Sequence, residues 1–535
     1  MVKEKKAPSF LMNVITIIFA QIAVKLLGFV YRMVITNIDG FGDMGNGYYN
    51  FGYQIYTLLL AISSIGIPNA ISKLVSERCA LDDFRGAMRI FRVALVLFLC
   101  VGGFFAVAMF FGAEFIATTI LDAPLAVYTI KVLSPALIFV SVSSVIRGFF
   151  AGQQNMKATN TSQVLEQFLK SLSTILIVLA MVGSKPEYMA AGATLATTVS
   201  TFLSLCYLFI FYSANKKTLK EKVKKAPAVK IEGNFGKIAK MILAVSIPIS
   251  LGAIVASLNR VVDIVTVVRG VKIALADKFP DVVTLGDEAV RLSGILSKTD
   301  VLVNLPLAIN TAFSTVLVPT VAGALAVKNF DTAREKISFS LLISIIIALP
   351  CSIGYMVLSG PILKLIYPNA SEGALIFTLV APTVFFSAMS QTIYGALQGM
   401  GKIYVPALSV LLGGIVKVIC NLVLIPIPAI NIYGAPIGSI FCQAIAFFVS
   451  FSVLRKNLDV RLPFGRYFAR PFAAAICMAV AVWGIYTLSS GLGNTAAAFI
   501  SIVSGSAVYL GLIAAFKVFS RDEIRQIPFV KKFMK

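Results

Sequence analysis

Long apolar runs, separated by short polar segments, recur along the whole chain. A helix needs about 20 mostly apolar residues to cross a bilayer, and fourteen runs reach roughly that length. They cover residues 10–35, 48–71, 90–111, 126–148, 160–182, 189–213, 241–267, 299–325, 337–359, 373–397, 404–426, 432–454, 468–489 and 495–517. The pattern predicts an all-α polytopic membrane protein with fourteen transmembrane helices.

Residues 133–170 are echoed, without a gap, by residues 380–417. The repeated landmarks are Pro135 and Pro382, Gly148 and Gly395, Gly152 and Gly399, and Lys170 and Lys417. Ala61-Ile62 matches Ala308-Ile309 at the same offset of 247 positions. Because one of the repeated residues is a lysine inside an apolar run, the match indicates an internal duplication.

Basic residues concentrate on alternate sides of the predicted spans. With the N-terminus inside, 34 of the 47 Lys and Arg fall on inner segments and seven on outer loops. The positive-inside rule therefore places both termini in the cytoplasm. Since no small-residue cleavage site follows the lysine-rich start, we expect the first helix to be retained. The one long outer loop, 269–298, is expected to form a short helix or hairpin cap.

Six spans separate matching positions of the duplication. Six is an even number, so both copies face the same way across the membrane, as parallel repeats. We expect a first lobe at residues 1–213, a second lobe at 241–454, and two additional helices with a basic tail at 455–535. The basic cytoplasmic linker 214–240 is interpreted as a topology signal that also attracts anionic lipid. Partner binding is the alternative.

Composition supports a membrane protein and excludes several kinds of chemistry. Hydrophobic residues make up 58%, charged residues 13%, and the mean hydropathy is +0.89. Because topology explains the net charge of +23, we expect no nucleic acid partner. The chain has no histidine, which excludes His-based catalysis and His–metal sites. None of the seven cysteines forms a C-x-x-C pair, and we expect no metal or cofactor.

Charged residues inside the spans cost about 2.5 to 3.5 kcal/mol each on insertion scales, so each calls for an explanation. These residues are Lys25, Arg32, Lys131, Glu166, Lys170, Arg260, Asp263, Asp300 and Lys417. Six are basic and three acidic, which predicts a basic cavity. Such a cavity suits an anion, and a phosphate or pyrophosphate fits well.

Lys25 and Arg32 lie seven residues apart in the first span, and so share one helix face. No acid within that span can neutralise them. The face therefore has to meet a polar cavity or acids of another helix. For Arg32, which lies near the end of the span, the alternative is that its side chain reaches the outer interface.

The remaining intramembrane charges leave two interpretations open. Glu166 and Lys170 are spaced i, i+4 in the favourable order for an ion pair, so they either neutralise each other or act in coupling and binding. Arg260 and Asp263, spaced i, i+3, present the same choice. Lys417 occupies the position equivalent to Lys170, which makes a basic pair across a pseudo-twofold axis plausible.

Four segments resemble a known transporter family. They are YNFGYQIYTLLLAISSIGIPNAISKLVSE (49–77), RGFFAGQQNM (147–156), TSQVLEQ (161–167) and LQGMGK (397–402). Through them the chain resembles the polysaccharide-transporter branch of the multidrug/oligosaccharidyl-lipid/polysaccharide flippase superfamily. The resemblance is strongest to the stage V sporulation protein B group, which includes Gram-positive lipid II flippases.

The resemblance implies two six-helix lobes around a central cavity that opens to each side of the membrane in turn. It also implies a lipid-tail groove made by the last two helices. Basic residues of the first span would line the cavity, and the matching stretch is 25–32, with Lys25 where an arginine is usual. Asn46 stands where the family has an acid.

The favoured hypothesis is a flippase of the bacterial plasma membrane. It would move an undecaprenyl-pyrophosphate-linked cell-wall precursor, lipid II or a related lipid-linked oligosaccharide, from the inner to the outer leaflet. Lys25, Arg32 and Arg260 would bind the pyrophosphate. Expected partners are this lipid-linked sugar, membrane lipids and cell-wall synthesis enzymes. The alternatives are a small-molecule exporter of the same superfamily and, less favoured, a membrane-embedded glycosyltransferase.

The remaining candidates have supporting roles in this hypothesis. Lys170 and Lys417 would shape the electrostatic potential of the cavity. Glu166 or Asp263 would couple transport to a cation. We expect no catalytic residue.

Overall fold

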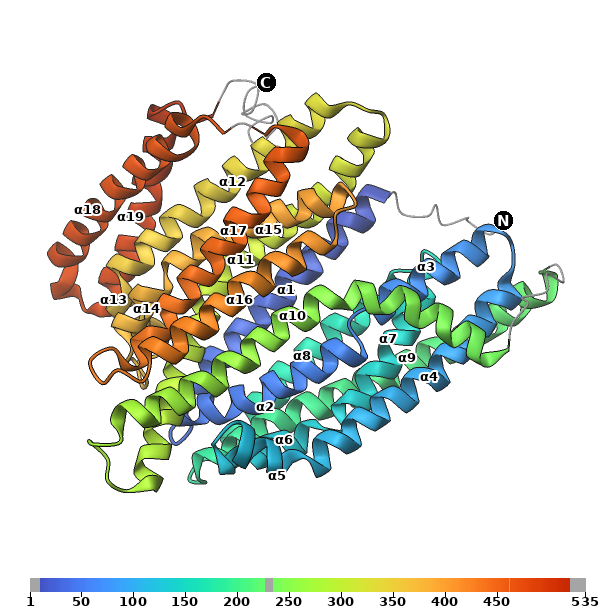
Figure 1. Cartoon of the computed structure of the whole chain (residues 1–535), viewed down its shortest axis with the longest axis horizontal. Helices are drawn as coiled ribbons and strands as arrows, with labels where there is room; N and C mark the ends of the chain where they lie inside the picture. Colours follow the sequence, from blue (N-terminus) through green and yellow to red (C-terminus); the bar gives the residue numbers. More distant parts are fainter. Residues whose placement is uncertain (1–9, 227–233, 461, 520–535) are drawn as a thin grey trace. The chain divides into compact units, whose positions relative to one another are not determined.

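The computed structural model describes residues 10–226, 234–460 and 462–519 (Figure 1). These residues form helices joined by short connections, and no strand occurs among them. They divide into two compact units. Unit 1 comprises Met1–Arg269 and Gly286–Gly294, and unit 2 comprises Gly270–Leu285 and Ile295–Lys535.

Unit 1 contains the first nine α-helices and most of the tenth. They are α1 (Phe10–Thr36), α2 (Gly42–Ser63), α3 (Ile67–Ala80), α4 (Phe84–Phe111), α5 (Ala113–Phe115), α6 (Val127–Leu133), α7 (Ala136–Gly152), α8 (Lys157–Ala180), α9 (Pro186–Lys225) and α10 (Phe235–Leu275).

Unit 2 contains most of α11 and all the helices after it. They are α11 (Val282–Ala326), α12 (Phe330–Val357), α13 (Ser359–Ile366), α14 (Ala374–Val380), α15 (Pro382–Gly399), α16 (Tyr404–Leu424), α17 (Gly434–Leu458), α18 (Arg470–Ser489) and α19 (Asn494–Ala515). The expected second lobe begins at residue 241, whereas α10 groups with unit 1 as far as Arg269. The division into repeat lobes stays a prediction.

Thirteen helical segments of the described chain are long and apolar enough to cross a membrane. Each coincides with a predicted span, and the first predicted span, 10–35, coincides with α1. The all-helical, multi-pass prediction is thus confirmed, while the count of fourteen stays a prediction.

Two segments expected to lie between spans are largely helical. The segment 269–298, expected to form a short helix or hairpin cap, is instead occupied by the ends of α10 and α11, which leave only residues 276–281 between them. The expected linker begins as a continuation of α9, which runs to Lys225. The apolar side chain of Leu219 anchors that extension in the core. Residues 227–233 of the linker and the tail after residue 519 lie outside the described residues.

The repeated prolines interrupt a helix in each unit. Pro135 separates α6 from α7, and Pro382 begins α15 immediately after α14 ends. A proline removes a backbone donor and clashes with the preceding turn, so a break at this point is expected. The same residue thus produces the same interruption in both copies.

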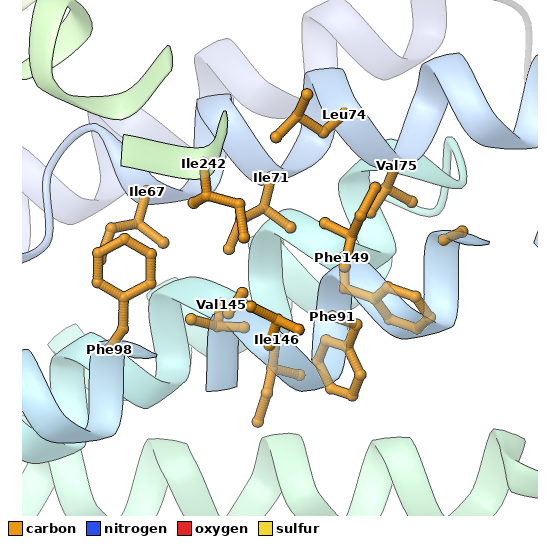
Figure 2. Close-up of a cluster of buried hydrophobic side chains, with 14 of the residues drawn as sticks. Ile67, Ile71, Leu74, Val75, Phe91, Phe98, Val145, Ile146, Phe149 and Ile242 are labelled. Carbon is orange, nitrogen blue, oxygen red and sulfur yellow. The ribbon is translucent and has the colours of Figure 1, made fainter. Parts of the chain in front are cut away.

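The core of unit 1 is apolar and joins several helices (Figure 2). Ile71 of α3, Phe91 of α4, Phe149 of α7 and Ile242 of α10 are all buried in it. The rings of Phe91 and Phe149 stack with centroids 4.3 Å apart. This packing holds together helices that are far apart in the sequence.

The repeated glycines make the same backbone contact in each unit. A Cβ on Gly148 would lie 2.8 Å from the carbonyl oxygen of Pro68, and one on Gly395 would lie 2.7 Å from that of Ser314. Only glycine allows so close an approach of two helices. Recurrence of this contact in both units is what an internal duplication requires.

The second glycine of each copy makes a matching contact, and both glycine contacts show the same change of register. A Cβ on Gly152 would meet the carbonyl oxygen of Ser72 at 2.8 Å, and one on Gly399 would meet that of Val318 at 2.7 Å. The contacted residues are therefore 246 positions apart, although the glycines are 247 apart. Unit 1 thus has one extra residue before this contact, in the region where α2 ends and α3 begins. Helix α11 continues without a break at the corresponding point.

We expect Gly148→Ala and Gly395→Ala each to destabilise the protein by about 1–3 kcal/mol, because the added methyl would push two helix backbones apart. Thermal unfolding in detergent measures the effect. Gly103→Ala in α4 is the matched control, since a Cβ there meets no atom within 4 Å. Equal stability of all three variants would contradict the close contact.

Candidate functional site

The two cations of α1 occupy different environments. The side chain of Lys25 is exposed within the described chain, whereas Arg32 is only 7% exposed. Although the spacing of seven residues places both on one face of α1, only Lys25 is open within the described chain. Their roles in binding stay predictions.

Arg32 and Lys170 flank a pair of tyrosines from α2. The guanidinium carbon of Arg32 lies 4.4 Å from the ring centroid of Tyr49, and Lys170 Nζ lies 4.4 Å from that of Tyr53. The two rings are stacked, with centroids 5.6 Å apart and an angle of 18° between their planes. We call these four residues the tyrosine stack. Because α1, α2 and α8 each contribute to it, it joins three helices.

Two further contacts complete the surroundings of the stack. The hydroxyl groups of Tyr31 and Tyr49 are 3.0 Å apart and hydrogen-bonded. Lys170 Nζ donates to the hydroxyl of Tyr53 over 3.4 Å and lies 5.6 Å from the ring centroid of Tyr31. Lys170 is 4% exposed and makes no ion pair with any described residue. Aromatic faces and a phenol oxygen stabilise its charge instead.

The spacing of the tyrosines explains why they meet the cations. Tyr49, Tyr53 and Tyr56 recur at i, i+4 and i+7, which places them on one face of α2. These tyrosines belong to the motif 49–77, but no role was predicted for them. Their helical spacing, together with the lysine and arginine in neighbouring spans, could have indicated cation–aromatic contacts.

Arg260 is positioned by a glutamine of α2 and a serine of its own helix, α10. Its Nε donates to Gln54 Oε1 over 3.0 Å, and its Nη2 donates to Ser257 Oγ over 2.9 Å. Gln54 in turn donates to Asn50 Oδ1 over 3.1 Å. The side chain of Arg260 is nevertheless exposed within the described chain. Asp263 is partly buried one turn further along α10, and its coupling role stays a prediction.

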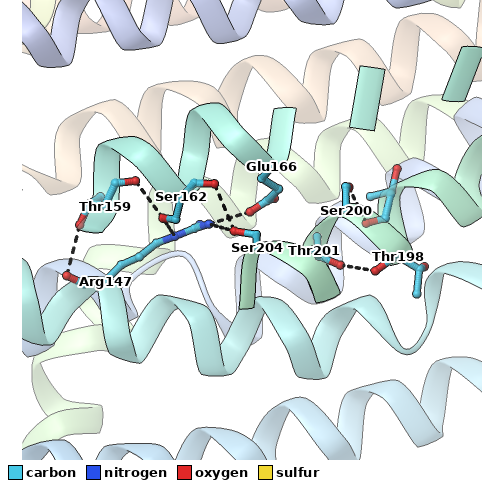
Figure 3. A network of polar contacts seen from close by, with 9 residues as sticks. Arg147, Thr159, Ser162, Glu166, Thr198, Ser200, Thr201 and Ser204 are labelled. Carbon is cyan, nitrogen blue, oxygen red and sulfur yellow. Dashed lines mark hydrogen bonds and ion pairs between the residues drawn. The ribbon is translucent and has the colours of Figure 1, made fainter. Parts of the chain in front are cut away.

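Glu166 pairs with an arginine from the end of the predicted span 126–148 (Figure 3). Arg147 lies within α7, is 7% exposed, and donates from Nη2 to Glu166 Oε2 over 2.6 Å. It also donates to Ser162 Oγ over 2.9 Å and to Ser204 Oγ over 3.0 Å. The expected alternative, an ion pair between Glu166 and Lys170, is therefore not the arrangement in this structure.

Lys417 lies in unit 2, on α16, and is partly buried. Its Cγ would be 3.4 Å from a Cβ on Gly438 of α17. The aliphatic part of the side chain therefore packs against the glycine of a neighbouring helix. The expected pairing of Lys417 with Lys170 stays a prediction.

Asn46, which stands where the resemblance implies an acid, is fully buried at the start of α2. Its amide donates to Thr36 Oγ1 over 2.8 Å and to the carbonyl of Gly42 over 3.0 Å. A neutral amide thus joins the end of α1 to the start of α2.

An apolar cavity of about 410 Å³ lies within unit 2, between α12–α13 and α18–α19. It is lined by Ile346, Ile347, Pro350, Cys351, Gly354, Tyr355, Leu358, Ile362, Met478, Val482, Ile502, Gly505, Ser506, Tyr509 and Leu510. Its walls are mostly apolar, which suits an acyl or isoprenoid chain. Among the described residues, no group of three or more Cys, Asp or Glu could hold a metal ion.

Comparison with protein-family models gives the family. Residues 10–325, more than half of the chain, match the model described as polysaccharide biosynthesis protein. The chain belongs to this polysaccharide biosynthesis protein family. Residues 290–374 also match the model of the lipid II flippase MurJ.

Two relatives of this family member come from Bacillus subtilis (strain 168). Stage V sporulation protein B is 24% identical over 527 residues, which covers 98% of this chain and 99% of the relative. Lipid II flippase MurJ is 24% identical over 445 residues, which covers 80% of this chain and 78% of the relative. The resemblance noted from the motifs is thereby confirmed.

Solved structures share the fold of this family member. Lipid II flippase MurJ in an inward closed conformation matches with a TM-score of 0.67 and 16% identity, covering 95% of this chain and 99% of that one. A MATE family multidrug resistance transporter in an inward-facing conformation matches with a TM-score of 0.65 and 14% identity, covering 83% and 98%. The fold is therefore the one common to MurJ and MATE transporters.

Replacing Tyr53 by Leu should destabilise this family member by about 1–2 kcal/mol, because Lys170 loses the aromatic face that stabilises its charge. Denaturant unfolding in detergent provides the measurement. Tyr53→Phe, which keeps the ring and removes only the hydroxyl, should cost less than half as much. If the Leu and Phe variants are equally stable, the ring does not stabilise the cation.

Proposed function

We propose that this protein is a flippase that moves an undecaprenyl-pyrophosphate-linked cell-wall precursor from the inner to the outer leaflet of the bacterial plasma membrane. Both termini face the cytoplasm, and the protein is a transporter rather than an enzyme. The observation that carries the proposal is the full-length match to stage V sporulation protein B, together with the match to MurJ in sequence and fold. The proposed substrate class is taken from the lipid II flippase among those relatives.

Exposed cations are suited to hold the diphosphate of such a substrate. Lys25 and Arg260 present positive charge that is not buried within the described chain. Gln54 and Ser257 orient the guanidinium of Arg260, and a pre-oriented guanidinium binds phosphate oxygens with little further ordering. In the proposed mechanism these two residues contact the diphosphate. Arg32, Lys170 and Lys417 contribute to the electrostatic potential around it.

The lipid part of the substrate requires an apolar surface. In the proposed mechanism the isoprenoid chain occupies the cavity between α12–α13 and α18–α19, which the last two helices help to form. Transport then alternates the access of the diphosphate site while the tail stays in an apolar environment. Glu166 and Asp263 are the candidate coupling carboxylates.

The second candidate function is export of a small molecule. The fold similarity to a MATE multidrug resistance transporter favours it. Drug efflux from vesicles that is insensitive to depletion of the wall precursor would support this alternative over the flippase.

Replacing Lys25 or Arg260 by Ala should reduce exposure of the precursor on the outer leaflet by about tenfold, because each change removes a charge-assisted contact to the diphosphate. Exposure is measured in cells depleted of their own lipid II flippase. Lys131→Ala, which removes another intramembrane lysine of unit 1, should leave it unchanged. Undiminished exposure with normal expression of both variants would remove these residues from the mechanism.

Ile502→Trp should lower the transport rate several-fold, since the indole would fill the cavity proposed for the tail. Val503→Trp is the matched control, because Val503 is exposed on the same helix and does not line the cavity. Initial rates in vesicles provide the measurement. If the two variants transport equally well, the cavity does not hold the tail.

A further inference from the structure

Glu166 lies between two cations, only one of which it binds. Arg147 Nη2 is 2.6 Å from Glu166 Oε2. Lys170 lies one turn further along α8, at i+4, on the face that also carries Glu166. Glu followed by Lys at this spacing is the order that favours an ion pair. The carboxylate can therefore reach either cation by rotation of side chains alone.

The Arg147 pairing ties α8 to two other helices. Arg147 comes from α7, and its guanidinium bonds Ser162 and Glu166 of α8 together with Ser204 of α9 (Figure 3). The hydroxyl of Ser204 also donates to the carbonyl of Ser162 over 3.1 Å. All these contacts lie on one side of α8.

The Lys170 contacts tie α8 to two different helices. Its ammonium group lies against Tyr53 of α2 and Tyr31 of α1. Ser171 adds a weaker contact to α1, donating to the carbonyl of Leu27 over 3.4 Å. In this structure the Arg147–Glu166 network joins α8 to α7 and α9. The contacts of Lys170 with tyrosines join α8 to α1 and α2.

We propose that Glu166 exchanges Arg147 for Lys170 during the transport cycle, and that this exchange releases α8 from both sets of neighbours at once. When Lys170 turns to Glu166, it leaves the tyrosine stack. When Glu166 leaves Arg147, the link across α7, α8 and α9 loses its charge pair. The two ties are therefore broken by one event, and α8 then carries an internally neutral pair.

The inference rests on the proposed transport function and assigns Arg147 and Glu166 as positioning residues within it. They act through the placement of α8 and, in this proposal, do not touch the substrate. The charged groups around Glu166 are Arg147 from α7 and Lys170 from α8 itself, and the phenol group of Tyr56 from α2 also interacts with it. The nearby group of α9 is the hydroxyl of Ser204.

The exchange is tested first on stability, which does not depend on transport. Glu166→Gln and Lys170→Gln are made singly and together, in the wild-type chain and in an Arg147→Gln chain, and unfolding equilibria are measured in detergent. With Arg147 present, the two changes should act independently. Without it, Glu166 is free to bind Lys170, so their effects should be coupled by about tenfold or more. Independent effects in both chains would overturn the exchange.

Arg147→Lys covers the case in which Arg147→Gln does not fold. It keeps the charge but loses the planar fork that reaches both serines. In that chain the coupling between Glu166 and Lys170 should be intermediate, and its absence would again overturn the proposal.

The second readout is transport of the lipid-linked precursor in vesicles. The transport rate should show coupling between positions 166 and 170 even with Arg147 present, because the cycle passes through the exchanged state. Coupling in stability but none in transport by a working flippase would overturn a role in the cycle. A wild-type protein that transports no precursor, yet shows the conditional coupling in stability, would defeat the proposed function and leave the exchange standing.

Discussion

Burying ionised side chains among apolar helices is the constraint that organises unit 1. A charge at the centre of a bilayer is tolerated only when protein groups replace the water it would otherwise have. The structure does this in two ways within a few turns of α8. Arg147 and Glu166 neutralise each other, and Arg147 also donates hydrogen bonds to two serines. Lys170 is stabilised instead by tyrosine faces and a phenol oxygen.

The ion pair and the cation–aromatic contact differ in the free energy that is lost when they break. A buried ion pair that loses one partner leaves an uncompensated charge, which typically costs about 3–5 kcal/mol. A cation on an aromatic face gives up about 2 kcal/mol when it leaves. Because both kinds of contact fix the same helix, α8 is held firmly in this arrangement. Another arrangement stays accessible only if the charges find new partners.

Sequence reasoning predicted the helices better than the environment of individual charges. Apolar runs of about 20 residues mark spans because that length matches the thickness of a bilayer. The predicted spans 126–148 and 373–397 nevertheless ran across Pro135 and Pro382, where the structure has interruptions. Lys298 shows the limit. It was expected in the outer loop 269–298, but it lies within α11, is 1% exposed, and donates to the carbonyl of Ala370. A charged segment at the end of a long helix has low hydropathy, so hydropathy alone assigns it to a loop.

The same limit applies to the candidate site. Arg147 lies near the end of the predicted span 126–148 that was expected to face the cytoplasm, so it was counted as a topology signal. Only the packing of α7 against α8 and α9 shows that its guanidinium turns inward. The tyrosines of α2 counted simply as apolar residues. In each case the missing information was which side chains from distant helices face one another, and no local pattern records that.

The extra residue between α2 and α3 affects where unit 1 can bend. It coincides with an interruption of the helix at Gly66, which packs so closely against α10 that a methyl group there would overlap the carbonyl oxygen of Ser246. At the corresponding place in unit 2, α11 continues as a helix and carries Pro306 within it. The two segments therefore differ: unit 1 has a turn between two helices, and unit 2 has a continuous helix. A change of angle in unit 1 could occur at that turn, whereas in unit 2 it would have to occur where a proline has removed a backbone hydrogen bond.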